Sequence, residues 1–450
     1  MGQVLEELKE EILESLKSDS KNIERTWVNR VKQVAQVLKI KIKSKEYDWN
    51  KIVDQATVHE VDSLENINDF TAQTKASTGS SSRDSMKEST STLPSKISLI
   101  DKEKIISLYK QMDETKMWKL STGKLVELQM LKMVESCNFE HPAHSFILDT
   151  EDENWMEYFT YDEMKEIKIC DVPPMGNIPT ELSSILEGVD NSMNIDDLHR
   201  RISATYYNPR NQHACHWLQR SLLEALELHM SGFLRENDQS ERDFISRLWR
   251  AILTAFDFSR MTIREERPCK ATDSMINKKR RLSTLDSIER KRRSKTPDHL
   301  IKFGAYEIGL TEAAKTEDKN GNKYFVDTMI KAPKMLKDML VKLIESSSHK
   351  KHSLRTVGFI TSGAEIKLIV MDMPGSYICR LLHTDSYKYP LEYLLFSKDM
   401  THCLQLIWTA KMILEDTIHD ITSVEPSQKI EFASMSEISI YPTFYNTSKK

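Results

Sequence analysis

The chain has 450 residues, of which 39% are apolar and 29% are charged, and its formal net charge is -4. Because domains hold about 100 to 200 residues, this length predicts two or three folded units. The charge balance excludes a uniformly basic nucleic-acid-binding protein. Scattered cysteines without CxxC spacing, and no run of roughly 20 apolar residues, predict an intracellular protein without a disulfide framework or a membrane span.

Residues 1–70 are predicted to form an amphipathic helical region, because apolar residues recur at helical spacing from Leu5 to Leu38. This stripe requires a partner surface. The partner is either another part of the chain or a helical protein partner in a short coiled coil. Residues 71–97 are rich in Ser and Thr and poor in large apolar side chains, so they are predicted to be a disordered linker.

Residues 98–260 are predicted to form a mainly helical domain. Apolar residues three and four apart recur there, for example between Trp217 and Met230. Residues 261–297 follow as a basic segment that is predicted to be exposed.

The apolar pattern changes after the basic segment, and residues 298–420 are predicted to form a small α/β domain. Helical runs at Lys334–Ser346 and Lys398–Asp416 flank the predicted strands. The fold class is therefore α+β, with a mainly helical N-terminal region before the α/β domain and a C-terminal tail at 421–450. Short runs rich in β-branched and aromatic residues indicate strands at 303–310, 354–362, 364–372 and 376–383.

Two clusters of basic residues are the sharpest local signal in the chain. Eight residues separate them, as in a bipartite nuclear-import signal, which predicts an importin-type receptor as partner and the nucleus as location. A solvated run of charge and contact with nucleic-acid phosphates are the alternatives. The cationic residues are Lys278, Lys279, Arg280, Arg281, Arg290, Lys291, Arg292, Arg293 and Lys295.

Two candidate phosphorylation sites accompany this signal. Ser283 follows two arginines and a leucine, as in basophilic kinase sites, and Thr296 precedes Pro297, as in proline-directed sites. A phosphate at either position would add negative charge beside the cations, so it is expected to weaken receptor binding.

The last third resembles a group of uncharacterised fungal proteins whose C-terminal halves look like the PD-(D/E)XK nuclease fold. The resemblance covers about residues 296 to 416. It implies a restriction-endonuclease-like α/β domain that acts on DNA or RNA. The matching segments are Lys302 to Leu310, Tyr324 to Ser346, Leu354 to Ile360 and Ile366 to Asp372.

The resemblance also implies candidate catalytic residues. In that family an Asp near one strand and the Glu and Lys of an E-x-K pair on the next strand hold Mg²⁺ ions, which activate water for phosphodiester cleavage. Carried over to this sequence, Asp298 matches the Asp and Glu307 the acid of the pair, and both would bind Mg²⁺. Gly309 occupies the position of the Lys, and Lys315 is the nearby cation that could replace it.

The missing lysine and the short spacing between Asp298 and Glu307 favour an inactive or strongly diverged core. The leading hypothesis is a nuclear protein whose diverged nuclease-like domain acts on or near nucleic acid. The alternatives are a helical scaffold protein that binds no nucleic acid, and an active Mg²⁺-dependent nuclease. These hypotheses differ in whether Asp298 and Glu307 converge on one metal-sized site. The basic rim of such a site would include Lys315, Lys319, Lys323 and Lys337.

Overall fold

The computed structural model describes residues 95–170, 172, 178–190, 192–235, 240–278, 291–314, 326–423 and 440–446. The predicted amphipathic region 1–70 lies outside the described residues, as does nearly all of the predicted linker. The described residues belong to one unit, Thr90–Lys450. Its fold is mixed α+β, in agreement with the coarse prediction from the sequence.

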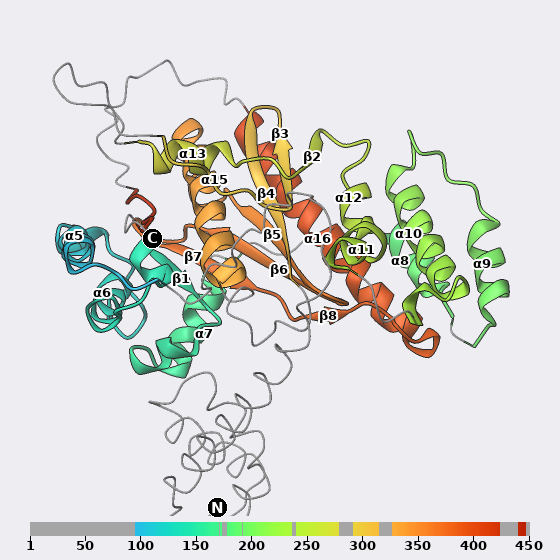
Figure 1. The fold of residues 1–450 in the computed structure, drawn as a ribbon, viewed down its shortest axis with the longest axis horizontal. Helices are drawn as coiled ribbons and strands as arrows, with labels where there is room; N and C mark the ends of the chain where they lie inside the picture. Colours follow the sequence, from blue (N-terminus) through green and yellow to red (C-terminus); the bar gives the residue numbers. More distant parts are fainter. Residues whose placement is uncertain are drawn as a thin grey trace, which may run out of the picture. The chain divides into compact units, whose positions relative to one another are not determined.

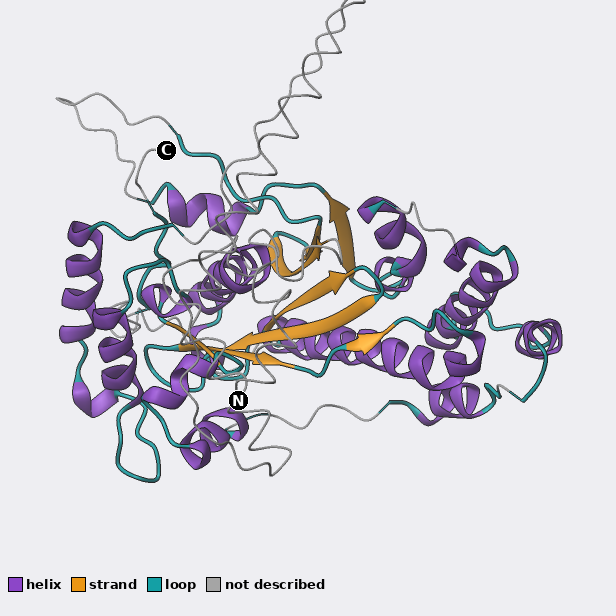
Figure 2. Ribbon diagram, turned by 60° about the horizontal axis from the view of Figure 1, so that its bottom comes forward, coloured by secondary structure: helices purple, strands orange, loops and turns teal. Residues whose placement is uncertain are grey.

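An eight-stranded mixed sheet runs through the described part of the chain (Figures 1 and 2). The strand order is β1-β7-β6-β5-β4-β3-β2, and the short β8 pairs with β6. The β1–β7 and β4–β5 pairs are parallel, whereas the other pairs are antiparallel. The strands are β1 (Ile147–Asp149), β2 (Met261–Glu265), β3 (His299–Phe303), β4 (Tyr306–Ala314), β5 (Thr356–Ser362), β6 (Glu365–Asp372), β7 (Cys379–His383) and β8 (Tyr387–Lys388).

Helices cover both faces of this sheet. Helix α15 (Ala332–Ser346) connects β4 to β5 and packs on one face, and the long α16 (Phe396–Thr422) packs on the other (Figures 1 and 2). A crossover helix is needed there because parallel neighbouring strands cannot be joined by a tight turn. None of the described helices combines the length and the apolarity needed to cross a membrane.

The helices that precede β2 in the chain form two groups beside the sheet. One group has its own core around Tyr109, Phe146 and Trp155, and the buried Arg380 of β7 joins it to the sheet by donating to the Ile167 carbonyl at 2.6 Å. The first group is α5 (Leu99–Lys110), α6 (Val126–Ser136) and α7 (Tyr161–Ile169). The second group is α8 (Thr180–Glu187), α9 (Ile195–Ser203), α10 (His213–Met230), α11 (Glu241–Asp243) and α12 (Arg250–Thr254).

The predicted strands and helices of the last third agree with the structure, with one difference. The predicted strand 303–310 is instead the turn and the first half of β4 in a β3–β4 hairpin. Gly304 makes this turn with a φ of +55°, a value that glycine adopts without steric cost. The hairpin therefore extends further than predicted in both directions, from His299 to Ala314.

Two strands of the sheet come from outside the predicted α/β domain. Strand β1 belongs to the segment predicted as a separate helical domain, and β2 belongs to the predicted basic segment. The sheet accepts both because β1 pairs in parallel with β7 and β2 pairs with β3. One sheet thus contains residues from three regions that the sequence predicts to be separate.

Candidate functional site

The structure does not bring Asp298 and Glu307 together. Glu307 lies at the turn end of the β3–β4 hairpin, where it pairs with Lys302, whereas Asp298 immediately precedes β3 at the other end. Because His299 pairs with Thr311, the position opposite Asp298 is Glu312. Glu312 lies five residue steps along the strand from Glu307, a distance of about 17 Å. The predicted pairing of Asp298 with Glu307 around one metal ion is therefore corrected.

The Glu307 carboxylate binds the N-terminus of helix α13 (Lys270–Ile276). It is only 5% exposed and accepts hydrogen bonds from the backbone N–H groups of Lys270 at 2.9 Å and Ala271 at 2.8 Å. The Cys269 thiol also donates to it at 3.3 Å, and burial together with the Glu307 charge raises the pKa of that thiol. A carboxylate is stabilised at a helix N-terminus, so Glu307 has a structural role in the fold.

Gly309, which occupies the position of the family lysine, is required by close packing. A Cβ atom at this position would lie 2.7 Å from the Val357 carbonyl oxygen of β5 and 3.2 Å from the Ile301 side chain. Strands β4 and β5 approach too closely there for any side chain. A lysine could not occupy this position without moving the neighbouring backbone.

A second acidic pair lies at the open end of the hairpin. Asp298 Oδ2 accepts a hydrogen bond from the Ala313 backbone N–H at 2.7 Å, which ties its carboxylate to the backbone of the residue after Glu312. Glu312 is 3% exposed, and Lys331, which directly precedes α15, places its Nζ atom 2.8 Å from Glu312 Oε1. The hairpin and α15 thus assemble two carboxylates and one ammonium group.

These residues do not fit a bound Mg²⁺ ion as they are arranged. Mg²⁺ is commonly held by one or two carboxylates and several waters. Here the Asp298 carboxylate already accepts a backbone N–H, and the Lys331 ammonium neutralises Glu312. Among the residues that the structure describes, no group of three or more His, Cys, Asp or Glu side chains is arranged to hold a metal.

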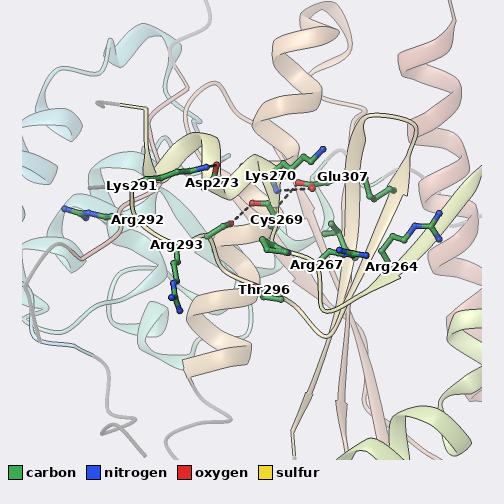
Figure 3. Close-up of a pocket in the computed structure, with 14 residues that line it drawn as sticks. Arg264, Arg267, Cys269, Lys270, Asp273, Lys291, Arg292, Arg293, Thr296 and Glu307 are labelled. Carbon is green, nitrogen blue, oxygen red and sulfur yellow. Dashed lines mark hydrogen bonds and ion pairs between the residues drawn. The ribbon is translucent and has the colours of Figure 1, made fainter. Parts of the chain in front are cut away.

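A basic groove lies beside α13. It encloses about 890 Å³ between β2, α13, β3 and residues 291–296. Figure 3 shows Arg264 and Arg267 on one side of it and Arg292 and Arg293 on the other. We call this site the basic groove, and its cationic residues are Arg264, Arg267, Lys270, Lys291, Arg292, Arg293 and Lys302.

The basic groove has a strong excess of positive charge. Its two acidic residues are Asp273, which lies 2.7 Å from Lys291 Nζ, and Glu307, which is occupied by the N-terminus of α13. Among the described residues, Lys291 is the one groove cation with an acidic partner. The other groove cations are therefore available to an external anion, and five of them are exposed arginine or lysine side chains.

Three of the nine cations of the predicted import signal line this groove. Lys291, Arg292 and Arg293 are exposed groove residues, and Lys278 and Lys295 are also exposed. The remaining members of the signal, Lys279, Arg280, Arg281 and Arg290, lie outside the described residues, as does Ser283.

The other predicted residues have separate positions. Thr296 is exposed and lines the basic groove. Lys315, Lys319 and Lys323 lie outside the described residues. Lys337 is fully buried, and its Nζ atom donates to the Tyr441 carbonyl at 2.9 Å, so it does not contribute to a basic rim.

The sequence patterns did not indicate Glu312, Lys331, the Arg264 of β2 or the Arg267 that follows β2. The one available signal for Glu312 was spacing, since a complete strand, turn and strand needs more than the eight residues between Asp298 and Glu307. Arg264 and Arg267 carried no local signal, because they join the groove only through the pairing of β2 with β3. No protein-family model matches the chain, and comparisons with curated proteins and with solved structures find no match.

Proposed function

We propose that this protein binds the phosphate backbone of DNA or RNA through the basic groove, without cleaving it. The observation that carries the proposal is the convergence of seven cationic residues from four segments of chain on one groove, whose two acids are already bound, one by Lys291 and one by backbone N–H groups. Lysine and arginine side chains that replace counterions at phosphates supply affinity without sequence preference. The groove is local, so it is compatible with a net charge of -4.

We also propose that the surrounding domain is a diverged nuclease-like, restriction-endonuclease-like core. Asp298 beside one strand and Glu312 on the next reproduce the acid pair of the PD-(D/E)XK family better than Asp298 with Glu307 does. The residue two positions after Glu312 is Ala314, where the family has a lysine. The Lys331 ammonium lies at Glu312, and a resident cation at the acid pair opposes metal binding.

The test is a salt series of binding to a short labelled DNA duplex and to single-stranded RNA, with full-length protein. We expect affinity to fall steeply from about 50 to 200 mM salt. Replacing Arg264 and Arg267 by Ala should weaken binding by about tenfold and reduce the log–log salt slope by about 2. The matched control replaces Arg200 and Arg210, which are exposed but lie outside the groove. Equal binding by the two double variants would overturn the proposal.

The competing function is Mg²⁺-dependent cleavage at Asp298 and Glu312, which follow one another across the register of the hairpin but which the Lys331 ammonium at Glu312 opposes. The same labelled nucleic acids, incubated with Mg²⁺ or Mn²⁺, distinguish the two candidates. Cleavage that disappears in Glu312→Gln would establish a nuclease. Intact substrate with unchanged binding supports the non-cleaving groove.

The proposal places the protein in the nucleus, with an importin-type receptor as its carrier. The exposed Arg292 and Arg293 would belong to the second half of the signal. Replacing both by Ala in a fluorescent fusion should abolish the higher concentration of the protein in the nucleus than in the cytoplasm. The Arg264→Ala and Arg267→Ala double variant should retain it.

A further inference from the structure

The second basic cluster is held against α13 at both ends of the helix. Asn277, at the C-terminal end, accepts a hydrogen bond from the Arg292 backbone N–H at 3.1 Å and donates to the Arg292 carbonyl at 3.2 Å. Cys269, at the N-terminal end, donates its backbone N–H to the Lys295 carbonyl at 3.0 Å. Ser294 Oγ donates to the Cys269 carbonyl at 2.5 Å. Residues 292–295 therefore run alongside α13 as part of the fold.

This arrangement fixes the backbone and leaves the cationic side chains exposed. Arg292 and Arg293 point away from α13 and line the basic groove (Figure 3). Lys291 also lines it and is bound to Asp273 of α13. The same side chains are thus the second half of the predicted import signal and one wall of the groove.

We infer that residues 291–295 are one interaction surface for which nucleic acid and an import receptor compete, so that binding of either excludes the other. The inference rests on the proposed function, since it concerns the partner of the same groove. Receptors of the importin type read basic clusters through acidic and aromatic grooves. An acidic receptor groove and a phosphate backbone would both bind the exposed guanidinium groups of Arg292 and Arg293. Two negatively charged partners at the same side chains would repel each other.

The hydrogen bonds to α13 determine which partner is favoured. A receptor that reads an extended chain must free the backbone of Arg292 and Lys295 from Asn277 and Cys269. The groove, in contrast, needs the segment in place. Loosening the segment should therefore strengthen receptor binding and weaken nucleic-acid binding, and a general loss of stability would not produce these opposite changes.

The experiment measures binding of a labelled DNA duplex to the full-length protein while a recombinant importin-type receptor is added. Under competition, the apparent Kd for DNA rises in proportion to free receptor, by about tenfold at ten times the receptor's own Kd. A ternary complex, or an apparent Kd that does not change, would overturn the inference while the proposed function stands. The inference also fails if the receptor does not bind. Absence of DNA binding without receptor would overturn the proposed function as well.

Two variants test the role of the fixed backbone. Asn277→Ala removes both hydrogen bonds to Arg292, and Ser294→Ala removes the bond to Cys269 without changing α13 itself. Ser294→Ala should tighten receptor binding by about fivefold, the equivalent of one hydrogen bond, and Asn277→Ala should tighten it more; both should weaken DNA binding. Arg264→Ala is the matched control, since it lies in the groove but outside the signal. It should weaken DNA binding and leave receptor binding unchanged.

Discussion

The two ends of the β3–β4 hairpin carry carboxylates in opposite electrostatic surroundings. At the turn end, Glu307 lies beside the basic groove and is bound by backbone N–H groups of α13. At the open end, Asp298 lines a pocket of about 370 Å³ that also contains Glu265 and Glu266. The first carboxylate supports the wall of a cationic groove, whereas the second lies near two further carboxylates, one of which pairs with Arg242. The comparison shows that neighbours contributed by distant segments decide the role of each acid.

The largest expected effect comes from Glu307→Ala. The substitution leaves the backbone N–H groups of Lys270 and Ala271 buried without their acceptor, and it should lower the free energy of unfolding by about 4 kcal/mol. Glu307→Gln keeps one acceptor and should cost about half as much. Urea unfolding of the full-length protein measures both. Full stability in Glu307→Ala would show that this carboxylate has no structural role. The contrast between the two ends of the hairpin would then not hold.

Lys331→Met tests whether the open end is an acid pair that a lysine neutralises. The variant removes the Lys331 ammonium from the buried Glu312 carboxylate, so the free energy of unfolding should fall by about 3 kcal/mol. Mg²⁺ should restore part of this loss in the variant and have no effect on the wild type, as measured by thermal unfolding. Stabilisation of the wild type by Mg²⁺ at the same concentration, lost in Glu312→Gln, would contradict the interpretation.

Gly309→Ala tests the packing between the two ends. The added Cβ atom would lie 2.7 Å from the Val357 carbonyl oxygen, so β4 and β5 must separate, at a cost of about 2 kcal/mol. Gly304→Ala is a useful comparison, because nothing lies within 4 Å of its Cβ position and only the positive φ opposes the substitution. A smaller loss for Gly309→Ala than for Gly304→Ala, in urea unfolding, would show that close packing is not the reason for this glycine.

The smallest expected effect is a pH dependence at the open end. Burial lowers the pKa of His299 below its usual 6.5, although Glu265, Asp298 and Glu266 oppose the shift. The unfolded state therefore binds a proton more readily, so stability from this residue is present above pH 6.5 and is lost as the pH falls through the lowered pKa. His299→Gln should reduce the decline in urea stability below pH 6.5. An unchanged decline would assign it to other groups.

Local sequence patterns predicted most elements of the last third. The runs that became β5, β6 and β7 are rich in β-branched and aromatic residues, and Gly363 provides the positive φ needed between β5 and β6. Helix α15 was recognisable because its apolar residues recur at helical spacing. The β3–β4 turn was missed, since Gly304 lies within an otherwise continuous strand-like run.

The candidate site was less predictable than the elements. The residues 291–295 were recognisable as a basic cluster because their charges are adjacent in the chain. Arg264, Arg267 and Lys302 reach the same groove only because β2 and β3 pair, and this pairing joins segments that no local pattern connects. Glu312 became recognisable only once the register of the hairpin placed it opposite Asp298.

The sequence by itself determined the local features of this protein: the overall charge, the basic cluster, and most helices and strands after residue 330. These depend on residues close together in the chain, through periodicity, turn preferences and adjacent charges. The tertiary structure alone decided that Glu307 binds α13, that Lys331 neutralises Glu312, and that the basic cluster lines a groove. These features depend on strand register and on packing between distant segments, which residue type and spacing do not specify.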